Sequence, residues 1–282
     1  MKLRIIAFLQ LFFFLFFGVT HSQSSPEFVK VAGFSHPESV VFDDTNNVLF
    51  VSNMGGDTKG DGFISKVSMD GKIIDTMWVS GLDDPKGLLV QKGKLFVSDN
   101  TRLIEMDLEK EQITKEYSIK DAVMLNDIAV DKNGNLYVSD TRKNSIYKMD
   151  TIGKISEWLS TEDLESPNGL LFVKGDLWIG AWGPGDKNGN VLKVNPKTKE
   201  IQRVSEQEIG NLDGLQQSKE GMVYTSDWAS GKIFEIDTLG KLQEVVTSAR
   251  SVGDILLMDK ENLLILPMNL QNEVWWYRLE KE

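Results

Sequence analysis

The chain has 282 residues, of which 41% are hydrophobic, and its formal net charge is −11. Such an acidic chain excludes nucleic acid and anionic membrane surfaces as favourable partners, because their charges repel it. It contains no cysteine, which excludes disulfides and lipid attachment at cysteine. No Pro- or Ser-rich linker interrupts the sequence, so we expect one domain over residues 23–282.

The first predicted element is an export signal over residues 1–22. Lys2 and Arg4 give it a positive start, and Ile5 to Val19 form a short apolar stretch that ends near a cleavage site at Thr20-His21-Ser22. The stretch is too short to span a bilayer comfortably. We therefore expect an exported protein, periplasmic or secreted, with no stable membrane insertion after cleavage.

A repeat follows the signal, and two features recur in it. The first is an anchor residue before an apolar strand, and successive anchors lie roughly 40 to 48 residues apart, the length of a four-stranded propeller blade. The anchors are Glu38, Lys86, Asn126, Asn168, Asp213 and Gly253. The second feature is an apolar run that closes in a small polar pair, as in Ser52-Asn53, Ser98-Asp99, Ser139-Asp140 and Ser226-Asp227. Turn residues between anchor and pair predict a hairpin in each repeat.

The last repeat shows how such a ring closes. It contains three predicted strands, Ile255 to Met258, Leu263 to Leu266 and Val274 to Leu279, and then the chain ends. The segment Phe28 to Ala32, just before the first anchor, can supply the missing outer strand and cover an exposed edge. We therefore predict an all-β, six-bladed β-propeller of four-stranded blades, with the N-terminal strand completing the last blade. A β-sandwich is the alternative, but it leaves the phased anchors unexplained.

Four of the anchors carry a side-chain oxygen: Glu38, Asn126, Asn168 and Asp213. A closed ring brings them together at its axis, and two carboxylates with two amide carbonyls suit a hard divalent cation. The loops after the polar pairs share this face, so Trp182, Trp228, Met54 and Met268 are expected to form an apolar wall. Asn168-Gly and Asp213-Gly could also be plain turns. Their phase with the other two anchors favours a site.

These phased segments, Pro-Glu38-Ser, Leu-Asn126-Asp, Pro-Asn168-Gly and Leu-Asp213-Gly, resemble the senescence marker protein (regucalcin)/gluconolactonase/luciferin-regenerating-enzyme family. The resemblance implies a six-bladed propeller that holds one divalent metal with Glu38, Asn126, Asn168 and Asp213, and that opens lactone rings. It also assigns Asp213 the role of general base. All-oxygen ligands favour Ca²⁺ first, with Mg²⁺ and Mn²⁺ as alternatives, and the family keeps Zn²⁺ open.

One position departs from the sugar-lactonase pattern. Met124 stands two residues before Asn126, where such relatives carry a substrate-binding arginine. We therefore expect a small-molecule substrate more apolar than a sugar lactone, with Arg142 or Arg102 as substitutes for the missing arginine. His36 is the one histidine left after export; it could orient Glu38 or simply lead into the first strand.

The sequence predicts an exported, metal-dependent hydrolase of the lactonase type. In it the metal polarises the substrate carbonyl for attack by water. The main alternative is a non-catalytic propeller, stabilised by the metal, that binds a ligand or another protein, since fold does not fix function. A condensing propeller resembling strictosidine synthase is a third hypothesis, but that chemistry does not call for four oxygen anchors.

Overall fold

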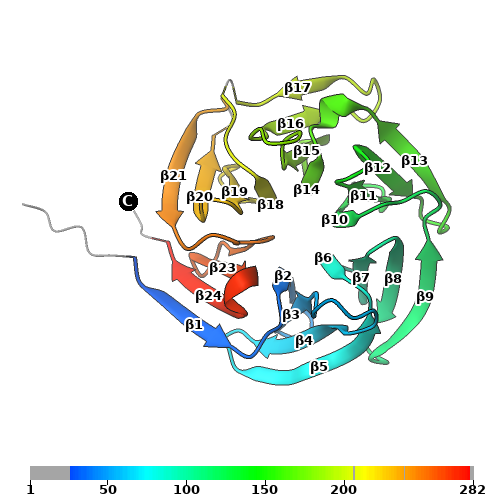
Figure 1. The fold of residues 1–282 in the computed structure, drawn as a ribbon, viewed down its shortest axis with the longest axis vertical. Coiled ribbons are helices and arrows are strands. Elements are labelled where there is room, and N and C mark those ends of the chain that lie inside the picture. Colours follow the sequence, from blue (N-terminus) through cyan, green and yellow to red (C-terminus); the bar gives the residue numbers. More distant parts are fainter. Residues whose placement is uncertain (1–25, 206, 238, 280–282) are drawn as a thin grey trace, which may run out of the picture.

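A computed structural model describes residues 26–205, 207–237 and 239–279. These residues form six four-stranded antiparallel sheets arranged as blades around a central axis (Figure 1). The predicted propeller is therefore confirmed. The predicted export signal lies outside the described residues. No helix in the described part of the chain is long and apolar enough to cross a membrane.

Each of the first five blades is built outward from the axis in chain order, whereas the last takes its outer strand from the N-terminal segment. The innermost strands are β2 (Pro37–Asp43), β6 (Pro85–Gln91), β10 (Leu125–Val130), β14 (Pro167–Val173), β18 (Leu212–Gln217) and β22 (Leu256–Met258). The second strands are β3 (Val48–Asn53), β7 (Lys94–Asp99), β11 (Leu136–Asp140), β15 (Asp176–Ala181), β19 (Val223–Asp227) and β23 (Leu263–Met268). The third strands are β4 (Gly62–Ser68), β8 (Arg102–Asp107), β12 (Ser145–Met149), β16 (Val191–Val194), β20 (Lys232–Ile236) and β24 (Glu273–Arg278). The outer strands are β5 (Ile73–Leu82), β9 (Gln112–Ser118), β13 (Ile155–Ser160), β17 (Ile201–Arg203), β21 (Leu242–Thr247) and β1 (Phe28–Ala32). Two short 3-10 helices, η1 (Glu162–Leu164) and η2 (Asn269–Gln271), complete the assignment.

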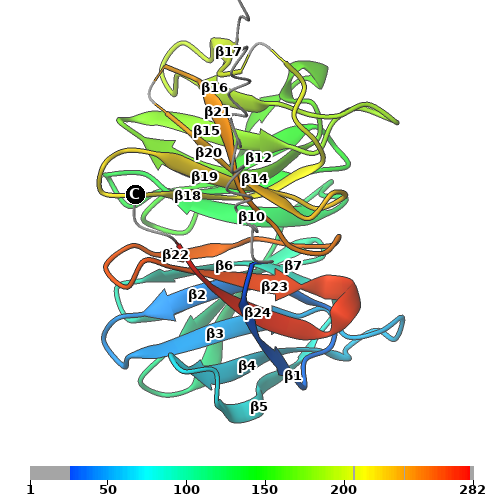
Figure 2. The same ribbon diagram turned by 90° about the vertical axis from the view of Figure 1, so that its left-hand side faces the viewer.

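The ring closes as the sequence predicts. Strand β1 pairs antiparallel with β24, from Phe28 opposite Tyr277 to Ala32 opposite Glu273. The Phe28 ring also packs 5.1 Å from the ring of Trp275. Figure 2 shows β1 lying beside β24, so that both ends of the described chain meet in one blade. This pairing covers the edge that the three C-terminal strands would otherwise expose.

Apolar clusters fill the interfaces between neighbouring blades, and strand periodicity explains them. Successive side chains of a strand point to opposite faces, so in β3 Leu49 and Val51 pack toward the last blade while Val48 and Phe50 pack toward the second. Since both faces of a blade are covered, a second strand such as β3 carries a continuous apolar run, Val48 to Val51. Each fully buried Val or Leu contributes about 1.5 to 3 kcal/mol.

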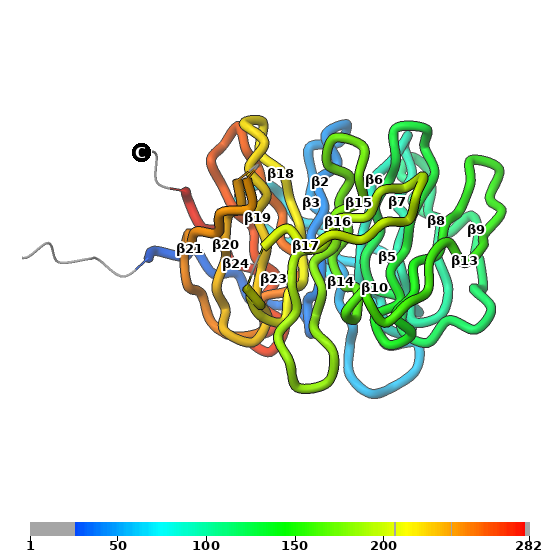
Figure 3. Tube along the Cα trace, turned by 90° about the horizontal axis from the view of Figure 1, so that it is seen from above, coloured from blue at the N-terminus to red at the C-terminus, as the bar shows by residue number. Residues whose placement is uncertain are grey.

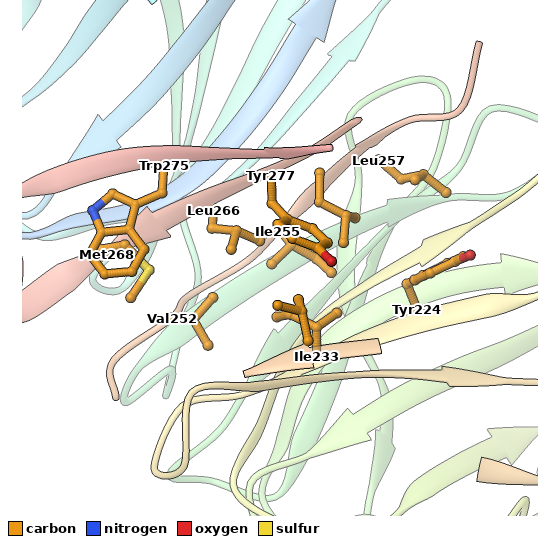
Figure 4. Packing of buried hydrophobic residues seen from close by; sticks show 11 residues of the cluster. Tyr224, Ile233, Val252, Ile255, Leu257, Leu266, Met268, Trp275 and Tyr277 are labelled. Atoms are coloured by element: carbon orange, nitrogen blue, oxygen red, sulfur yellow. The ribbon is translucent and has the colours of Figure 1, made fainter. Parts of the chain in front are cut away.

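The cluster between the last two blades is shown in Figure 4. Ile233 of β20 and Leu266 of β23 face one another across it, together with Val252, Met268 and Trp275. Met268 is fully buried there. The expectation that Met268 lines the pocket is therefore wrong: Met268 is the last residue of β23, where side chains point to the two faces of the blade, and it packs against the neighbouring blade.

Candidate functional site

A β-bulge lies at the anchor of each of the first five innermost strands. In β10, for example, the register with β11 shifts between Leu125 and Ile128, so the bulge spans Asn126. The corresponding shifts lie at Pro37/Val40, Pro85/Leu88, Pro167/Leu170 and Leu212/Leu215. A bulge leaves a residue out of the ladder and re-aims its side chain. Here it frees the anchors to point toward the axis of the ring.

The four oxygen-bearing anchors line one cavity of about 440 Å³ at this end of the axis, together with Lys86. Glu38, Asn126, Asn168 and Asp213 are all buried, with exposed fractions of 1 to 6%. They come from four different blades, and only closure of the ring brings them together. The convergence expected from the sequence is therefore present in the structure.

Two oxygens of this set show that the residues fit a cation. Glu38 Oε2 and Asn168 Oδ1 are buried, and neither has a hydrogen-bond partner among the described residues. An unsatisfied buried acceptor costs about 1 to 3 kcal/mol, and a bound cation would remove that cost. No group of three or more His, Cys, Asp or Glu side chains in the described residues could hold a metal. The four anchors do not form such a group, because two of their four oxygen donors, Asn126 and Asn168, are amides and not carboxylates.

The electrostatics of the protein without metal support the same interpretation. Burial, and then the Asp213 charge, raise the pKa of Glu38 well above its usual value. Burial, and then Asp127, raise the pKa of Asp213 to about 7. Lys86 lowers both pKa values, but not enough to cancel these effects. Without a cation, burial thus favours the neutral forms of these carboxyls, whereas a divalent cation would favour their charged forms.

The polar pairs at the ends of the second strands hold the anchors in place. Their serines bond to the neighbouring blade: Ser139 Oγ donates to Asn168 O over 2.7 Å and Ser226 Oγ to Gly253 O over 2.8 Å, and Ser98 Oγ donates to Asn126 O. These three serines therefore link neighbouring blades. The acidic partner acts within its own blade, since Asp140 accepts the Val123 and Met124 N–H groups.

A second phased ring forms the cavity wall. The residue directly after the pair lines the cavity in five blades, and its backbone N–H donates to the carbonyl two residues before the anchor. These wall residues are Met54, Thr141, Trp182, Trp228 and Asn269, with donor–acceptor distances of 2.9 to 3.1 Å. Sequence reasoning missed Thr141 and Asn269. Their signal was present, because both follow their pair at the same offset as Trp182 and Trp228.

The wall has an aromatic side and a basic side. The Trp182 and Trp228 rings lie 5.6 Å apart, and both side chains are partly buried. Met124 and Arg142 also line the cavity, as expected. Arg102 does not substitute there, because it pairs with Asp99 and Glu116.

The anchor Lys86 and the residue His36, two positions before the anchor Glu38, each make a polar contact near the cavity. Lys86 Nζ lies 3.1 Å from Asp84 Oδ1, so it acts as a charge partner for a neighbouring acid. His36 adopts a left-handed φ of 48° just before Pro37, and its Nδ1 contacts Gly55 O at 2.6 Å. His36 therefore leads into β2 and holds the loop that follows β3.

Figure 3 shows long loops of the first and fourth blades, light blue and yellow-green, projecting from one face of the ring.

Farther along the same strands lies a second axial cavity of about 300 Å³. Its lining is mainly apolar, with Leu88, Ile128 and Leu215 in corresponding positions, and it contains Asp127 and Asp254. Asp254 Oδ2 accepts the Ser39 hydroxyl over 2.8 Å, and Asp127 Oδ2 accepts the Leu170 N–H over 2.6 Å. Both carboxyls thus tie neighbouring blades together. Neither was singled out from the sequence.

Comparison with known proteins agrees with this architecture. A gluconolactonase structure from Xanthomonas campestris is 14% identical, with a TM-score of 0.70, and covers 90% of each chain. A putative gluconolactonase is 18% identical, with a TM-score of 0.68, covering 91% of this chain and 94% of its own. An inactive virginiamycin B lyase from Staphylococcus aureus with quinupristin is 13% identical, with a TM-score of 0.62, covering 90% of this chain and 99% of its own.

At these identities the solved structures show a shared fold. No curated protein sequence matches the chain. Residues 36–265, which include every anchor, match the family described as the SMP-30/Gluconolactonase/LRE-like region. The chain belongs to the SMP-30/gluconolactonase/LRE-like family.

Proposed function

We propose that this protein is an exported, divalent-metal-dependent hydrolase that opens an ester or lactone bond in a small, largely apolar substrate. The observation that carries the proposal is the ring of Glu38, Asn126, Asn168 and Asp213 at one cavity, with two buried oxygens left unsatisfied. Family membership supports the lactonase class, since gluconolactonases belong to it. The N-terminal segment, with its charged start and apolar stretch, supports export.

The four anchors would hold the cation, with Ca²⁺ favoured by the all-oxygen donor set. When bound, it supplies Lewis-acid polarisation of the substrate carbonyl, worth several kcal/mol. Asp213 is the proposed base. One of its oxygens can bind the cation while the other accepts the proton of the attacking water.

The wall residues contribute by positioning the substrate and excluding water. Trp182, Trp228, Met124 and Met54 offer apolar and aromatic surface around the ionic centre. A polyhydroxy lactone would leave its hydroxyl groups unpaired against this surface, at about 1 to 3 kcal/mol for each buried group. An aromatic or alkyl lactone gains from the same contacts. We therefore place the natural substrate among apolar lactones or esters.

A non-catalytic, metal-stabilised binding propeller is the competing hypothesis, and turnover separates the two. Calorimetry with Ca²⁺ and Zn²⁺ on the mature protein should show one tight site, and Asp213→Ala should lose it. Asp43→Ala is the matched control, because Asp43 is a buried aspartate at the far end of the same kind of strand and its carboxylate accepts the Thr45 N–H and the Asn46 side-chain amide in the following turn. It should bind metal as the wild type does.

Hydrolysis is then measured on dihydrocoumarin, an alkyl γ-lactone and gluconolactone, with and without metal. We expect metal-dependent turnover, fastest on dihydrocoumarin, and a product heavier than the substrate by one water. A product of unchanged mass would indicate elimination instead of hydrolysis. Metal binding without turnover on any lactone would favour the binding propeller, and absence of metal binding would overturn the proposal.

A further inference from the structure

The basic side of the cavity wall is not explained by lactone opening alone. Arg142 lies at the start of the loop after β11 and its side chain is exposed. It lines the cavity, yet within the described residues it makes no hydrogen bond and no ion pair. Its guanidinium offers its N–H donors to the cavity mouth.

The charges that line the cavity reinforce this. Glu38 and Asp213 are its acidic lining residues, and Lys86 and Arg142 its basic ones. A divalent cation at the anchors would offset both carboxylates and leave the two basic side chains in excess. Asp84, which is outside the lining, partners Lys86. Arg142 therefore presents a positive charge at the exposed edge of the cavity, where no acidic side chain of the described residues pairs with it. Such local fields favour entry of an anion.

The positive and aromatic sides come from different blades. Lys86 and Arg142 belong to the second and third blades, whereas Trp182 and Trp228 belong to the fourth and fifth. The anchors lie between the two sides. A molecule whose scissile carbonyl reaches the anchors can therefore place an apolar or aromatic ring against the tryptophans and an anionic group against Arg142.

We propose that the substrate is an amphiphilic anion: an aromatic or alkyl lactone or ester that carries a carboxylate, which Arg142 binds while the tryptophan pair holds the apolar part. This inference rests on the proposed function for its scissile bond. Its recognition elements are independent of turnover and can be tested by binding. Arg142 acts here as a specificity residue, and the fork of its guanidinium matches a carboxylate with two parallel hydrogen bonds.

The test uses two non-hydrolysable lactam analogues of dihydrocoumarin. One bears a carboxylate on the benzene ring and the other bears the primary carboxamide at the same carbon, so they differ in charge and hardly in size. Calorimetry on the Ca²⁺-loaded protein should show the carboxylate binding at least about tenfold more tightly, as expected for a charge-assisted contact. The preference should shrink as NaCl rises, because salt screens exposed charges.

Variants assign the preference to its residue. Arg142→Gln should reduce the preference to about twofold or less, and Arg142→Lys should keep most of it. Arg250→Gln is the matched control: Arg250 is exposed, its guanidinium lies 5.2 Å from the Trp228 ring, and it does not line the cavity. Its removal takes one positive charge from the protein and should leave the preference unchanged.

The outcomes separate this inference from the proposed function. Equal binding of both analogues, binding of neither, or a preference that survives Arg142→Gln would overturn the inference. Hydrolysis of the parent lactones is measured in parallel with calcium present. Turnover without a carboxylate preference leaves the hydrolase standing and removes the anionic substrate. A preference without turnover supports anion recognition and counts against the hydrolase.

Discussion

The two ends of the innermost strands are built from the same strands but present opposite chemistry to the axis. At the bulged end, the anchors of the first five blades point a carboxylate, amide or ammonium group into the larger cavity. Two residues farther on, the corresponding positions carry Val40, Leu88, Ile128, Leu170 and Leu215, which line the smaller one. The polar end has unsatisfied oxygens, whereas Asp127 and Asp254 at the other end are tied to neighbouring blades.

This difference shows how a propeller can hold a polar site at one end of its axis while the other end keeps the inner strands packed together. The apolar end packs the inner strands together, and burial there stabilises the ring. The bulges then release the anchors from the ladder at the other end. A substitution at the anchors should therefore affect mainly metal binding and catalysis, and one at the apolar end mainly stability. The following experiments test whether the two effects are separate.

The largest effect is expected at the anchors. Glu38→Gln keeps the shape of the side chain and removes its charge, so affinity for Ca²⁺ should fall sharply. Metal-dependent lactone hydrolysis should fall by about 10³-fold, since the metal contributes several kcal/mol to the transition state. Calorimetry and initial rates measure the two effects.

The control for this change is Glu105→Gln. Glu105 is as deeply buried as Glu38 but lies in a third strand, where it pairs with Lys94 at 2.6 Å. It should lose stability and keep metal binding. If both variants bound metal equally well, Glu38 would not be a ligand.

The contact between inner strands should give the next largest effect. A Cβ at Gly169 would lie 1.9 Å from Asp213 O, a backbone atom that cannot move aside. Gly169→Ala should therefore destabilise the protein by about 3 kcal/mol, the upper range for overpacking, and weaken metal binding by displacing Asp213. Urea unfolding with and without Ca²⁺ measures both.

Gly56→Ala is the matched control for that substitution. Its Cβ would approach only the end of the Asp61 side chain, at 3.3 Å, and its backbone has no left-handed φ. Its stability should change by less than about 0.5 kcal/mol. Equal stability of the Gly169 and Gly56 variants would mean that the inner strands are not packed as tightly as the structure indicates.

The apolar end is probed best in the sixth blade, whose anchor is a glycine and supplies no ligand. Leu256 of β22 is buried and lines the smaller cavity, and Gly253 is the anchor of that blade. Leu256→Ala should cost about 2 to 3 kcal/mol through lost burial and the cavity left behind. Its Ca²⁺ affinity, measured by calorimetry well below the melting temperature, should match the wild type. A parallel loss of metal binding would show that the two ends are coupled.

The architecture could be predicted from the sequence because it depends on the spacing of the anchors and on the number of strands in each repeat. The spacing of the anchors sets the blades, and the missing fourth strand after Val274 to Leu279 identifies Phe28 to Ala32 as its substitute, which the pairing of β1 with β24 confirms. The side-chain types at Glu38, Asn126, Asn168 and Asp213 indicated convergence, which the shared cavity bears out. Their role as metal ligands stays a prediction.

The parts that escaped prediction depend on contacts between blades. Met268 was assigned to the pocket and instead packs between the last two blades, because its orientation depends on the local register of β23. The bulges leave no clear trace in the residue types. The roles of Asp127 and Asp254 could not be read from sequence either, since their partners, Leu170 and Ser39, are supplied by other blades.

The smallest expected effect is the pH dependence of stability, compared between the protein without metal and the protein loaded with Ca²⁺. In the protein without metal, the pKa of Glu38 and of Asp213 is raised above its unfolded value, mainly by burial. Such groups stabilise the fold below their unfolded pKa, and this contribution is lost as pH rises through the folded pKa, about 7 for Asp213. Bound metal would favour the charged carboxylates. The difference in melting temperature between Ca²⁺-loaded and EDTA-treated protein should therefore increase from pH 5 to pH 8, by about 2 to 4 °C for each kcal/mol.

Glu38→Gln provides the control for this pH effect as well, since it removes one of the two titrating carboxyls. Its calcium-dependent gain in melting temperature should be smaller and should vary less with pH. The wild-type gain must rise with pH if the anchor carboxylates bind the cation, because protons compete for the same oxygens. A gain that is constant or falls between pH 5 and pH 8 would place calcium binding elsewhere on this acidic chain, on carboxylates that are already ionised at pH 5.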